Sequence, residues 1–553
     1  MGTVVAAMTL SSCTSDLTGL NNDPKHPTSL PSGNLFAKGQ QQQFYYTYTG
    51  NVNNNNYVYF TQMWAETTYT DETNYDIVTR NQPRNTFNRM YNGVLNNYEQ
   101  ARKNLATEGA DANKLASIEI AEISAWENIV DTFGDVPYSQ ALQADQGQFA
   151  PAYDDAKAIY TDLFKRINAV IPTITAGSGY AEDLVYGGDM TKWKKVANSI
   201  KLRLALNLAD VDPATSKSAA ESAIASGVMT SIVDSYSLAF PGGTFSNPFF
   251  DDFIASGRKD FVPTTLVVDM MNAKMDPRRT NYFIENITPN EVASITPPVT
   301  PSTTTSITLT DALVTTPDAN GIIPVHVGSK VYNYQPTDTQ KGTTEKATLI
   351  GKVSSINGKT ITVDNVGTVA VKDVLTFDYY VGGKFGSLNP FPNYTHYNYE
   401  TWLQPKAAAS LLSYTEVLFM ITEAAARNYN VGGGTAASWY AKAVTNSMTE
   451  HGVSSTDAAT YLLVHPYDAA NWKKSIGEEA YIALHNSSFA EWNFSRRLDF
   501  PVFVNPTNSK TAGVPVRMPY SDQEYVLNAA NVKAAAAKIG GDKPENKLFW
   551  DKF

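Results

Sequence analysis

The sequence predicts a mainly α-helical protein, built from tetratricopeptide-like helical pairs with long loops and one small β-rich insertion. Three observations lead to this prediction. Long stretches in both halves of the chain repeat apolar residues at helical spacing. Small residues alternate with large ones in these stretches, as they do in helices that pack in antiparallel pairs. Between the halves, a Thr- and Pro-rich region contains short runs of Val, Ile and Thr instead.

Four helices are expected in the first half of the chain. Residues 113–133 carry a clear apolar stripe, and residues 154–171 follow with the same periodicity. Residues 190–208 form the third helix, for which Asp189 is a suitable N-cap. Residues 214–226 form a short fourth helix.

The second half is expected to hold five more helices, over residues 413–428, 435–451, 472–486, 489–497 and 522–539. Gly432, Gly433 and Gly434 separate the first two, which therefore fold back on each other as an antiparallel hairpin. Gly540 and Gly541 end the last helix.

The region between the halves is expected to be an insertion rich in β-structure, over residues 289–376. Its strongest signal is Asn357-Gly358 between two alternating runs, because Asn-Gly suits the two positive φ angles of a type I′ hairpin turn. The chain then divides into five segments of one overall domain: a lipoprotein signal with its lipobox (1–13), a tether (14–45), a first helical half with ligand-facing loops (46–288), the β-rich insertion with aromatic loops (289–405), and a second helical half (406–553).

The single cysteine lies in a sequence typical of bacterial lipoproteins. A short apolar stretch ends in residues 10–13 (LSSC), where small residues precede Cys13 as a lipoprotein signal peptidase requires. Acylation of Cys13 would anchor the chain, because each buried methylene contributes about 0.8 kcal/mol. No Lys or Arg precedes the apolar stretch, which departs from the usual basic start of such signals. The alternative is an ordinary buried cysteine.

The composition excludes several classes of protein. The formal net charge of −11 removes the electrostatic basis for binding nucleic acid. One cysteine excludes a disulfide within the chain, and no run reaches the 18 or so apolar residues of a membrane-spanning helix. Tyr is abundant, at 31 residues, and combines a large ring with a polar tip.

No catalytic, metal-binding or cofactor-binding pattern is found. The six His residues form no zinc motif, and neither a nucleophile elbow nor a phosphate-binding glycine loop is present. Adjacent carboxylates occur at 154–155, 251–252 and 478–479. Sequence neighbours do not face each other as a glycosidase pair must, so we expect them to be solvated helix starts or turn caps.

Short strings spread over most of the chain resemble one family. The most distinctive are residues 131–138 (DTFGDVPY), 183–189 (DLVYGGD), 414–417 (YTEV), 495–497 (SRR) and 517–520 (RMPY). Their order, together with the lipobox, resembles the SusD/RagB-like nutrient-binding outer-membrane lipoproteins of Bacteroidetes, and more closely the subgroup called SusD-like type 2. The resemblance implies a surface lid over a SusC-like TonB-dependent transporter, facing the cell exterior, that captures oligosaccharide or oligopeptide without catalysis.

These strings also have structural explanations. Asp135 in its tight turn can accept backbone N–H groups. The Arg496-Arg497 pair can bind a carboxylate such as Glu416 or Glu423. We therefore expect these residues to stabilise the scaffold and not to bind ligand.

Two aromatic clusters are the candidates for ligand binding, since sugars are held by flat rings and a few directed hydrogen bonds. The first cluster, over residues 60–75, offers Trp64, Tyr69, Asn74 and Tyr75. The second, over residues 377–402, offers Tyr379, Tyr380, Tyr394, Tyr397 and Trp402. The alternative is packing: Phe60 and Trp64 share a helix face, and the residues from Tyr394 to Trp402 can lie beneath the insertion.

Arg80 and Arg84 offer a different chemistry, since a guanidinium binds the carboxylate of a peptide or a uronic acid; ordinary surface solvation is their alternative role. Of the possible functions, we favour a glycan-binding lid over an oligopeptide-binding one. A surface glycoside hydrolase and a purely structural adaptor are the remaining hypotheses.

Overall fold

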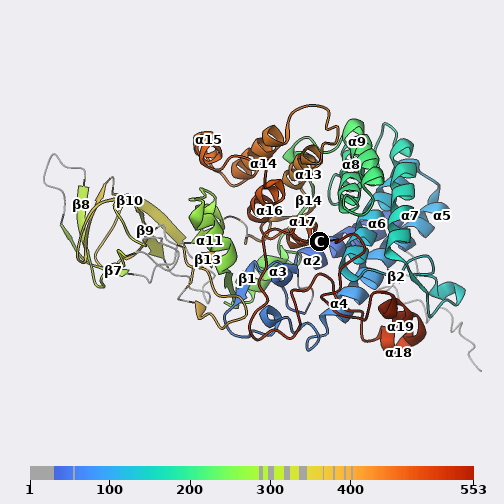
Figure 1. Ribbon diagram of the computed structural model, residues 1–553, viewed down its shortest axis with the longest axis horizontal. Coiled ribbons are helices and arrows are strands. Elements are labelled where there is room, and N and C mark those ends of the chain that lie inside the picture. The colour runs from blue at the N-terminus through green and yellow to red at the C-terminus, as the bar shows by residue number, and fades with distance from the viewer. Residues whose placement is uncertain are drawn as a thin grey trace, which may run out of the picture.

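The computed structural model describes residues 30–53, 57–284, 290–296, 304–316, 324–335, 346–364, 366–377, 380–391, 394–399, 401 and 403–552. Three residues singled out in the sequence, Cys13, Tyr379 and Trp402, lie outside these ranges. Figure 1 shows a helical body with the β-rich region projecting from one end. Within the described ranges, no helix has both the length and the apolar character needed to cross a membrane.

The body is formed by two groups of helices. The first comprises α2 (Ser32–Tyr48), α3 (Tyr57–Phe60), α4 (Gln82–Asn88), the π-helix η2 (Arg89–Leu95), α5 (Asn96–Glu108), α6 (Ala112–Phe133), α7 (Ala156–Val170), α8 (Met190–Asn207), α9 (Pro213–Ser226), α10 (Pro248–Phe250), the π-helix η6 (Asp251–Ala255), α11 (Thr265–Ala273) and α12 (Arg279–Tyr282). The second comprises α13 (Tyr414–Ala426), α14 (Ala436–Glu450), α15 (Ser455–Val464), α16 (Trp472–Ala483), α17 (Ser488–Leu498), α18 (Glu524–Leu527) and α19 (Ala529–Lys538). Short 3₁₀ helices are η1 (Glu72–Asn74), η3 (Ala144–Gln146), η4 (Ile171–Thr173) and η5 (Ile232–Asp234).

The mainly helical fold is confirmed, and the expected helices of the first half appear as α6 to α9. Their ends follow the local sequence. Asp189 caps α8 by accepting hydrogen bonds from the backbone of Thr191 at 2.9 Å and Lys192 at 3.3 Å. Gly134, with φ of 85°, ends α6. Asp135 then accepts the backbone N–H of Ala156 at 2.9 Å, as predicted.

The expected helices of the second half also form, except that the last one is interrupted. The prediction of one helix over residues 522–539 is wrong, because the chain breaks at Asn528 into α18 and α19. The Asn528 side chain donates to the carbonyl of Pro151 at 2.8 Å and to Glu524 at 3.2 Å. Such local polar contacts compete with helix continuation.

The expected tether over residues 14–45 is wrong in its described second part, which forms the buried helix α2. Its inner face is partly polar: Gln40 donates to Asp183 at 2.8 Å, and Gln43 accepts the hydroxyl of Tyr98 at 2.7 Å. Gly39 permits this close packing, because a Cβ there would lie 2.4 Å from the Tyr98 ring. Because glutamines occupy buried positions of α2, the sequence of this helix shows no clear apolar periodicity.

The insertion is a closed six-stranded antiparallel barrel in the order β10-β11-β8-β7-β12-β9. Its strands are β7 (Asn290–Thr296), β8 (Thr304–Leu309), β9 (Lys330–Gln335), β10 (Lys346–Asn357), β11 (Thr360–Asp364) and β12 (Val374–Phe377). Alternating side chains fill it, including Ile307, Val331 and Ile361. The expected hairpin joins β10 to β11, but Asn357 pairs with Thr360 and only Gly358 in the turn has a positive φ, so the turn is not type I′.

Four two-stranded ribbons connect the loops of the body: β1 (Trp64–Glu66) with β5 (Phe261–Pro263), β2 (Val136–Pro137) with β3 (Tyr153–Asp154), β4 (Tyr236–Ala239) with β14 (Ala408–Leu412), and β6 (Phe283–Ile284) with β13 (His396–Tyr397). The last ribbon stands at the root of the barrel, because β6 precedes β7 and β13 follows β12 (Figure 1). The barrel is therefore inserted between two strands that pair with each other.

Buried ion pairs tie the helices together. Arg203 of α8 binds Glu127 at 2.7 Å and Glu416 at 3.2 Å, and Arg497 of α17 binds Glu423 at 2.9 Å. The predicted contact of the Arg496-Arg497 pair with a carboxylate is thus confirmed for Arg497. Removing one partner of such a pair is strongly destabilising, because it leaves an uncompensated buried charge.

Two expectations about charged neighbours are wrong. Arg496 stacks on Trp492, with 3.6 Å between the guanidinium carbon and the ring centroid, and donates to backbone carbonyls. Glu479, expected to be a solvated helix start, is fully buried and forms an ion pair with Arg278. Both residues therefore hold the scaffold.

Candidate functional site

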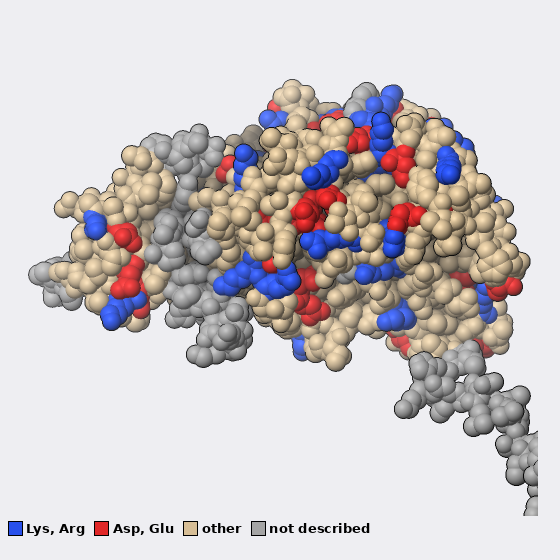
Figure 2. Space-filling model, turned by 90° about the horizontal axis from the view of Figure 1, so that it is seen from below, with Lys and Arg blue, Asp and Glu red and all other residues tan. Residues whose placement is uncertain are grey.

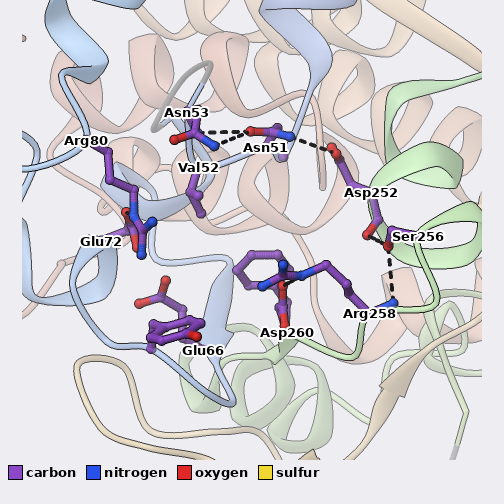
Figure 3. A pocket seen from close by; sticks show the side chains of 13 residues that line it. Asn51, Val52, Asn53, Glu66, Glu72, Arg80, Asp252, Ser256, Arg258 and Asp260 are labelled. Atoms are coloured by element: carbon purple, nitrogen blue, oxygen red, sulfur yellow. Dashed lines mark hydrogen bonds and ion pairs between the residues drawn. The ribbon is translucent and has the colours of Figure 1, made fainter.

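A polar cavity of about 210 Å³ opens where three segments of the first half meet. We call it the polar pocket; it is lined by residues 50–53, by Glu66, Tyr69, Glu72 and Arg80, and by Asp252, Ser256, Arg258, Asp260 and Phe261. Figure 3 shows side chains from these segments surrounding one space. The pairing of β1 with β5 sets Glu66 opposite Phe261 and so joins the second and third segments.

Two glutamates form the innermost acidic wall. Glu66 is only 2% exposed, and its Oε2 accepts the backbone N–H of Thr73 at 3.0 Å and the Thr73 hydroxyl at 2.7 Å. Burial raises the pKa of Glu66 to about 9, and a hydrogen bond with Glu72 contributes in the same direction. Glu66 is therefore protonated at neutral pH and is the donor in its hydrogen bond with Glu72.

Two arginines contribute the positive charge of the pocket. Arg80 forms an ion pair with Glu72 and lies 3.4 Å from Asp71, and Arg258 pairs with Asp260. Because each guanidinium already has a carboxylate partner, most of the charge in the pocket is balanced. Fixed, paired charges of this kind are well placed to donate to and accept from uncharged hydroxyl groups.

Tyr69 supplies the aromatic surface. Its side chain is 56% exposed at the pocket, and the Arg80 guanidinium carbon lies 5.8 Å from the ring centroid. The contact with Arg80 orients the ring through a cation–π attraction. Of the residues predicted to bind ligand, the structure brings Tyr69 and Arg80 together in one cavity.

Asp251 and Asp252 stand in the first turn of η6, as the expectation of a helix start requires, but Asp252 also contacts other side chains. Asp252 lies in the wall of the polar pocket, where it accepts a hydrogen bond from the amide of Asn51 at 3.3 Å (Figure 3). It also accepts one from the hydroxyl of Thr49 at 3.1 Å. Burial raises the pKa of Asp252 to about 6, while these hydrogen bonds act in the opposite direction. Asp252 is therefore a part of the candidate site that the sequence did not reveal.

Three other predicted ligand residues lie in the core beneath the pocket. Trp64 is fully buried among Phe249, Phe253, Phe261 and Tyr397, and its indole N–H donates to Asn486 at 3.0 Å. Tyr397 donates to the carbonyl of Met63 at 3.1 Å, and Tyr75 accepts from Gln62 at 2.8 Å. In this structure these rings support the pocket and do not line it, so the packing alternative holds for Trp64 and Tyr397.

The remaining predicted residues are dispersed. Asn74 is buried and donates to the carbonyls of Thr70 at 2.7 Å and Gly386 at 3.1 Å. Tyr380 is buried near the barrel, with the Arg279 guanidinium 5.3 Å from its ring.

Tyr394 and Arg84 lie outside the pocket. Tyr394 is half-buried against Ala65, Val262 and Phe391. Arg84 forms an ion pair with Asp522 at the surface.

Sequence reasoning missed most of the acidic and amide residues of the pocket. The Asn-rich run at residues 51–56 was an available signal, because Asn51 and Asn53 line the cavity. Asp260 and Arg258 carried no signal, because only strand pairing brings them to Glu66. In the described part of the chain, no group of three or more His, Cys, Asp or Glu side chains is placed to hold a metal ion.

Charge is mixed on the face of the molecule seen from below in Figure 2. On the face in Figure 2, acidic and basic side chains alternate over the helical body. This face of the described part of the chain therefore offers no broad field of one sign that would concentrate a highly charged ligand.

Comparison with known proteins identifies relatives of this fold. A family model described as "Starch-binding associating with outer membrane" matches residues 24–296 and 368–521. The unmatched part between them contains strands β8 to β11 of the barrel. Comparison with curated proteins gives no significant match.

Solved structures match along nearly the whole chain. A chitin-binding protein is 21% identical, with a TM-score of 0.70 over 94% of this chain and 100% of the other. A chitin-binding SusD homolog from Flavobacterium johnsoniae is 19% identical, with a TM-score of 0.67 over 94% and 98%. A SusD homolog from Bacteroides ovatus is 20% identical, with a TM-score of 0.67 over 94% and 99%. At this level of identity the structures establish a common fold.

Proposed function

This chain belongs to the SusD-like family, and we propose that it is a non-catalytic, cell-surface lipoprotein that captures oligosaccharide in the polar pocket. Acylated Cys13 would anchor it in the outer membrane, facing the exterior. There it would act as the lid of a SusC-like TonB-dependent transporter and pass the captured ligand inward. The description of the family as starch-binding and outer-membrane-associated supports this proposal.

The observation that carries the proposal is the exposed Tyr69 ring above a wall of paired charges. A neutral sugar presents an apolar ring face and a rim of hydroxyls, which these two features match. An oligopeptide lid is the alternative. It is disfavoured because Arg80 and Arg258, the cations that would bind a peptide carboxylate, already pair with Glu72 and Asp260.

Titration calorimetry with malto-, cello-, xylo- and chito-oligosaccharides tests the proposal on the purified protein. We expect binding of at least one series, and Tyr69→Ala should weaken it roughly tenfold or more, as truncation of an anchoring aromatic residue does. Tyr69→Phe keeps the ring and is the matched control, with most of the affinity retained. Binding of oligopeptides with no binding of any saccharide would refute the glycan assignment.

The same incubation tests the absence of catalysis. Glu66 and Glu72 share a hydrogen bond, whereas the two carboxyl groups of a glycosidase stand about 5–10 Å apart. We therefore expect no new reducing ends after prolonged incubation with a bound oligosaccharide. Turnover that disappears on substitution of one carboxylate in the pocket would establish a hydrolase instead.

A further inference from the structure

A second and larger cavity, of about 510 Å³, lies beside the helical segment α4–η2–α5. Its wall on this segment carries four amide side chains at intervals of four residues: Asn88, Asn92, Asn96 and Gln100. Gln140 and Gln143 face them from the loop that follows β2. We call this cavity, with these six residues, the amide groove.

The π-helix explains why the four amides share one side. In an α-helix, residues four apart advance by about 6 Å but also rotate by about 40°, so a long stripe winds away from its cavity. The segment Arg89–Leu95 is a π-helix, which winds more loosely. The angular offset between residues four apart in the π-helix is opposite in sense to that in the flanking α-helical turns. Asn92 and Asn96 therefore remain in line with Asn88 and Gln100.

The amides on the helix are largely free to bind a ligand. Within the described ranges, the side chains of Asn92, Asn96 and Gln100 make no hydrogen bond, and Asn88 donates only to Gln523, at 2.9 Å. On the opposite wall, Gln143 donates to the carbonyl of Ser139 at 2.9 Å, and Gln148 donates to Gln140 at 2.9 Å. The loop is thus fixed by its own contacts, while the helix offers unused donors and acceptors.

The chemistry of the groove selects an uncharged ligand that carries amides. Among the residues that the structure describes, no Lys or Arg lines it. Its two carboxylates are engaged, Asp145 with Lys103 at 3.0 Å and Glu524 with Tyr153 at 3.0 Å. Each side-chain amide offers two N–H donors and one acceptor oxygen. An acetamido group, with one N–H and one C=O, pairs with such an amide in both directions. Apolar atoms of Phe87 and Leu142 are available to its methyl group.

The groove and the polar pocket are connected through the same helical segment. Arg80 lines the polar pocket, and Gln82, the first residue of α4, donates to Glu72 there at 3.3 Å. Residues 80 to 100 span at most about 30 Å as a helix. An extended oligosaccharide of several units is long enough to reach from one cavity toward the other.

We propose that the amide groove is a second binding site, specific for N-acetylated hexose units of an oligosaccharide. The proposal rests on the oligosaccharide-binding function above and adds to it a place and a preferred sugar. The side-chain amides would hydrogen-bond the acetamido groups, about one for each 6 Å step along the helix.

Chitohexaose and cellohexaose provide a matched pair of probes, because they share a β-1,4-linked backbone and differ in the acetamido group. We expect calorimetry on the whole protein to show tighter binding of chitohexaose. Asn92→Ala combined with Asn96→Ala should weaken chitohexaose binding roughly tenfold and leave cellohexaose binding unchanged. Both residues are exposed, so folding should be preserved, and Asn168→Ala, an exposed asparagine of α7, is the control.

The outcomes separate the groove from the polar pocket. Unchanged chitohexaose binding in the double variant would overturn the proposal that the groove binds this sugar. A loss of chitohexaose binding in Tyr69→Ala would still support binding in the polar pocket. An equal loss for both probes would overturn the preference for acetamido groups. If neither probe binds the unmodified protein, the groove proposal fails, and the proposed function is decided by the other oligosaccharide series.

Discussion

Replacing Glu66 with Gln tests whether the carboxyl group inside the polar pocket is neutral. The pKa of Glu66 is raised from 4.5 to about 9, mainly by burial, so the folded protein keeps a proton that the unfolded chain loses above pH 4.5. The contribution of Glu66 to the free energy of unfolding therefore falls by about 1.4 kcal/mol for each pH unit between these two values. A Gln side chain does not titrate and avoids this cost. Its oxygen can accept from Thr73, and its NH₂ group can donate to Glu72.

Glu66→Gln should therefore stabilise the protein, by roughly 3 kcal/mol at pH 7, with a gain that grows as pH rises toward 9. Urea unfolding of both proteins at several pH values between 5 and 9 measures the difference directly. Glu182→Gln, at an exposed position, is the matched control for the change from carboxyl to amide. A variant that is less stable than the unmodified protein at every pH would show that Glu66 is ionised in the fold and would refute the reasoning.

Two further predictions concern the core and the anchor. Trp64→Ala should lower the free energy of unfolding by about 3–5 kcal/mol, because a fully buried ring is removed; urea unfolding checks this, and a loss of sugar binding with unchanged stability would contradict it. Cys13→Ala should move the protein from the membrane fraction to the soluble fraction of cells. A variant still firmly bound to membranes would refute the lipid anchor.

Local patterns predicted the fold well where packing and sequence period agree. The predicted helices α6, α7, α8, α13, α14, α16 and α17 bury apolar residues at helical spacing. The predicted short helix α9 buries only small residues, and α15 was not expected. The family resemblance, drawn from short ordered strings, is confirmed. Helix α2 was missed because its buried face uses Gln40 and Gln43, whose partners Asp183 and Tyr98 lie far away in the sequence.

The candidate site was harder to predict, because aromatic residues serve both the core and ligand binding. Trp64 and Tyr69 are five residues apart in one aromatic cluster, yet Trp64 is fully buried and Tyr69 is 56% exposed. The exposure of each side chain depends on the pairing of β1 with β5. This pairing covers Trp64 with Phe261 and leaves the following loop, which carries Tyr69, at the surface. Sequence composition identified the region but not the side chains that face outward.

The position of the barrel leaves the packing of the helical body uninterrupted. The barrel enters after β6 and leaves before β13, and these two strands pair with each other. Tyr397 of β13 then packs against Trp64 beneath the polar pocket, with 5.7 Å between the ring centroids. Because both ends of the insertion are fixed by this ribbon, the barrel leaves the packing under the pocket continuous. Every residue that lines the polar pocket lies within the first segment matched by the family, residues 24–296. The capture site proposed for this chain thus lies in the part of the body that the family model matches, whereas strands β8 to β11 of the barrel lie between its two matched segments.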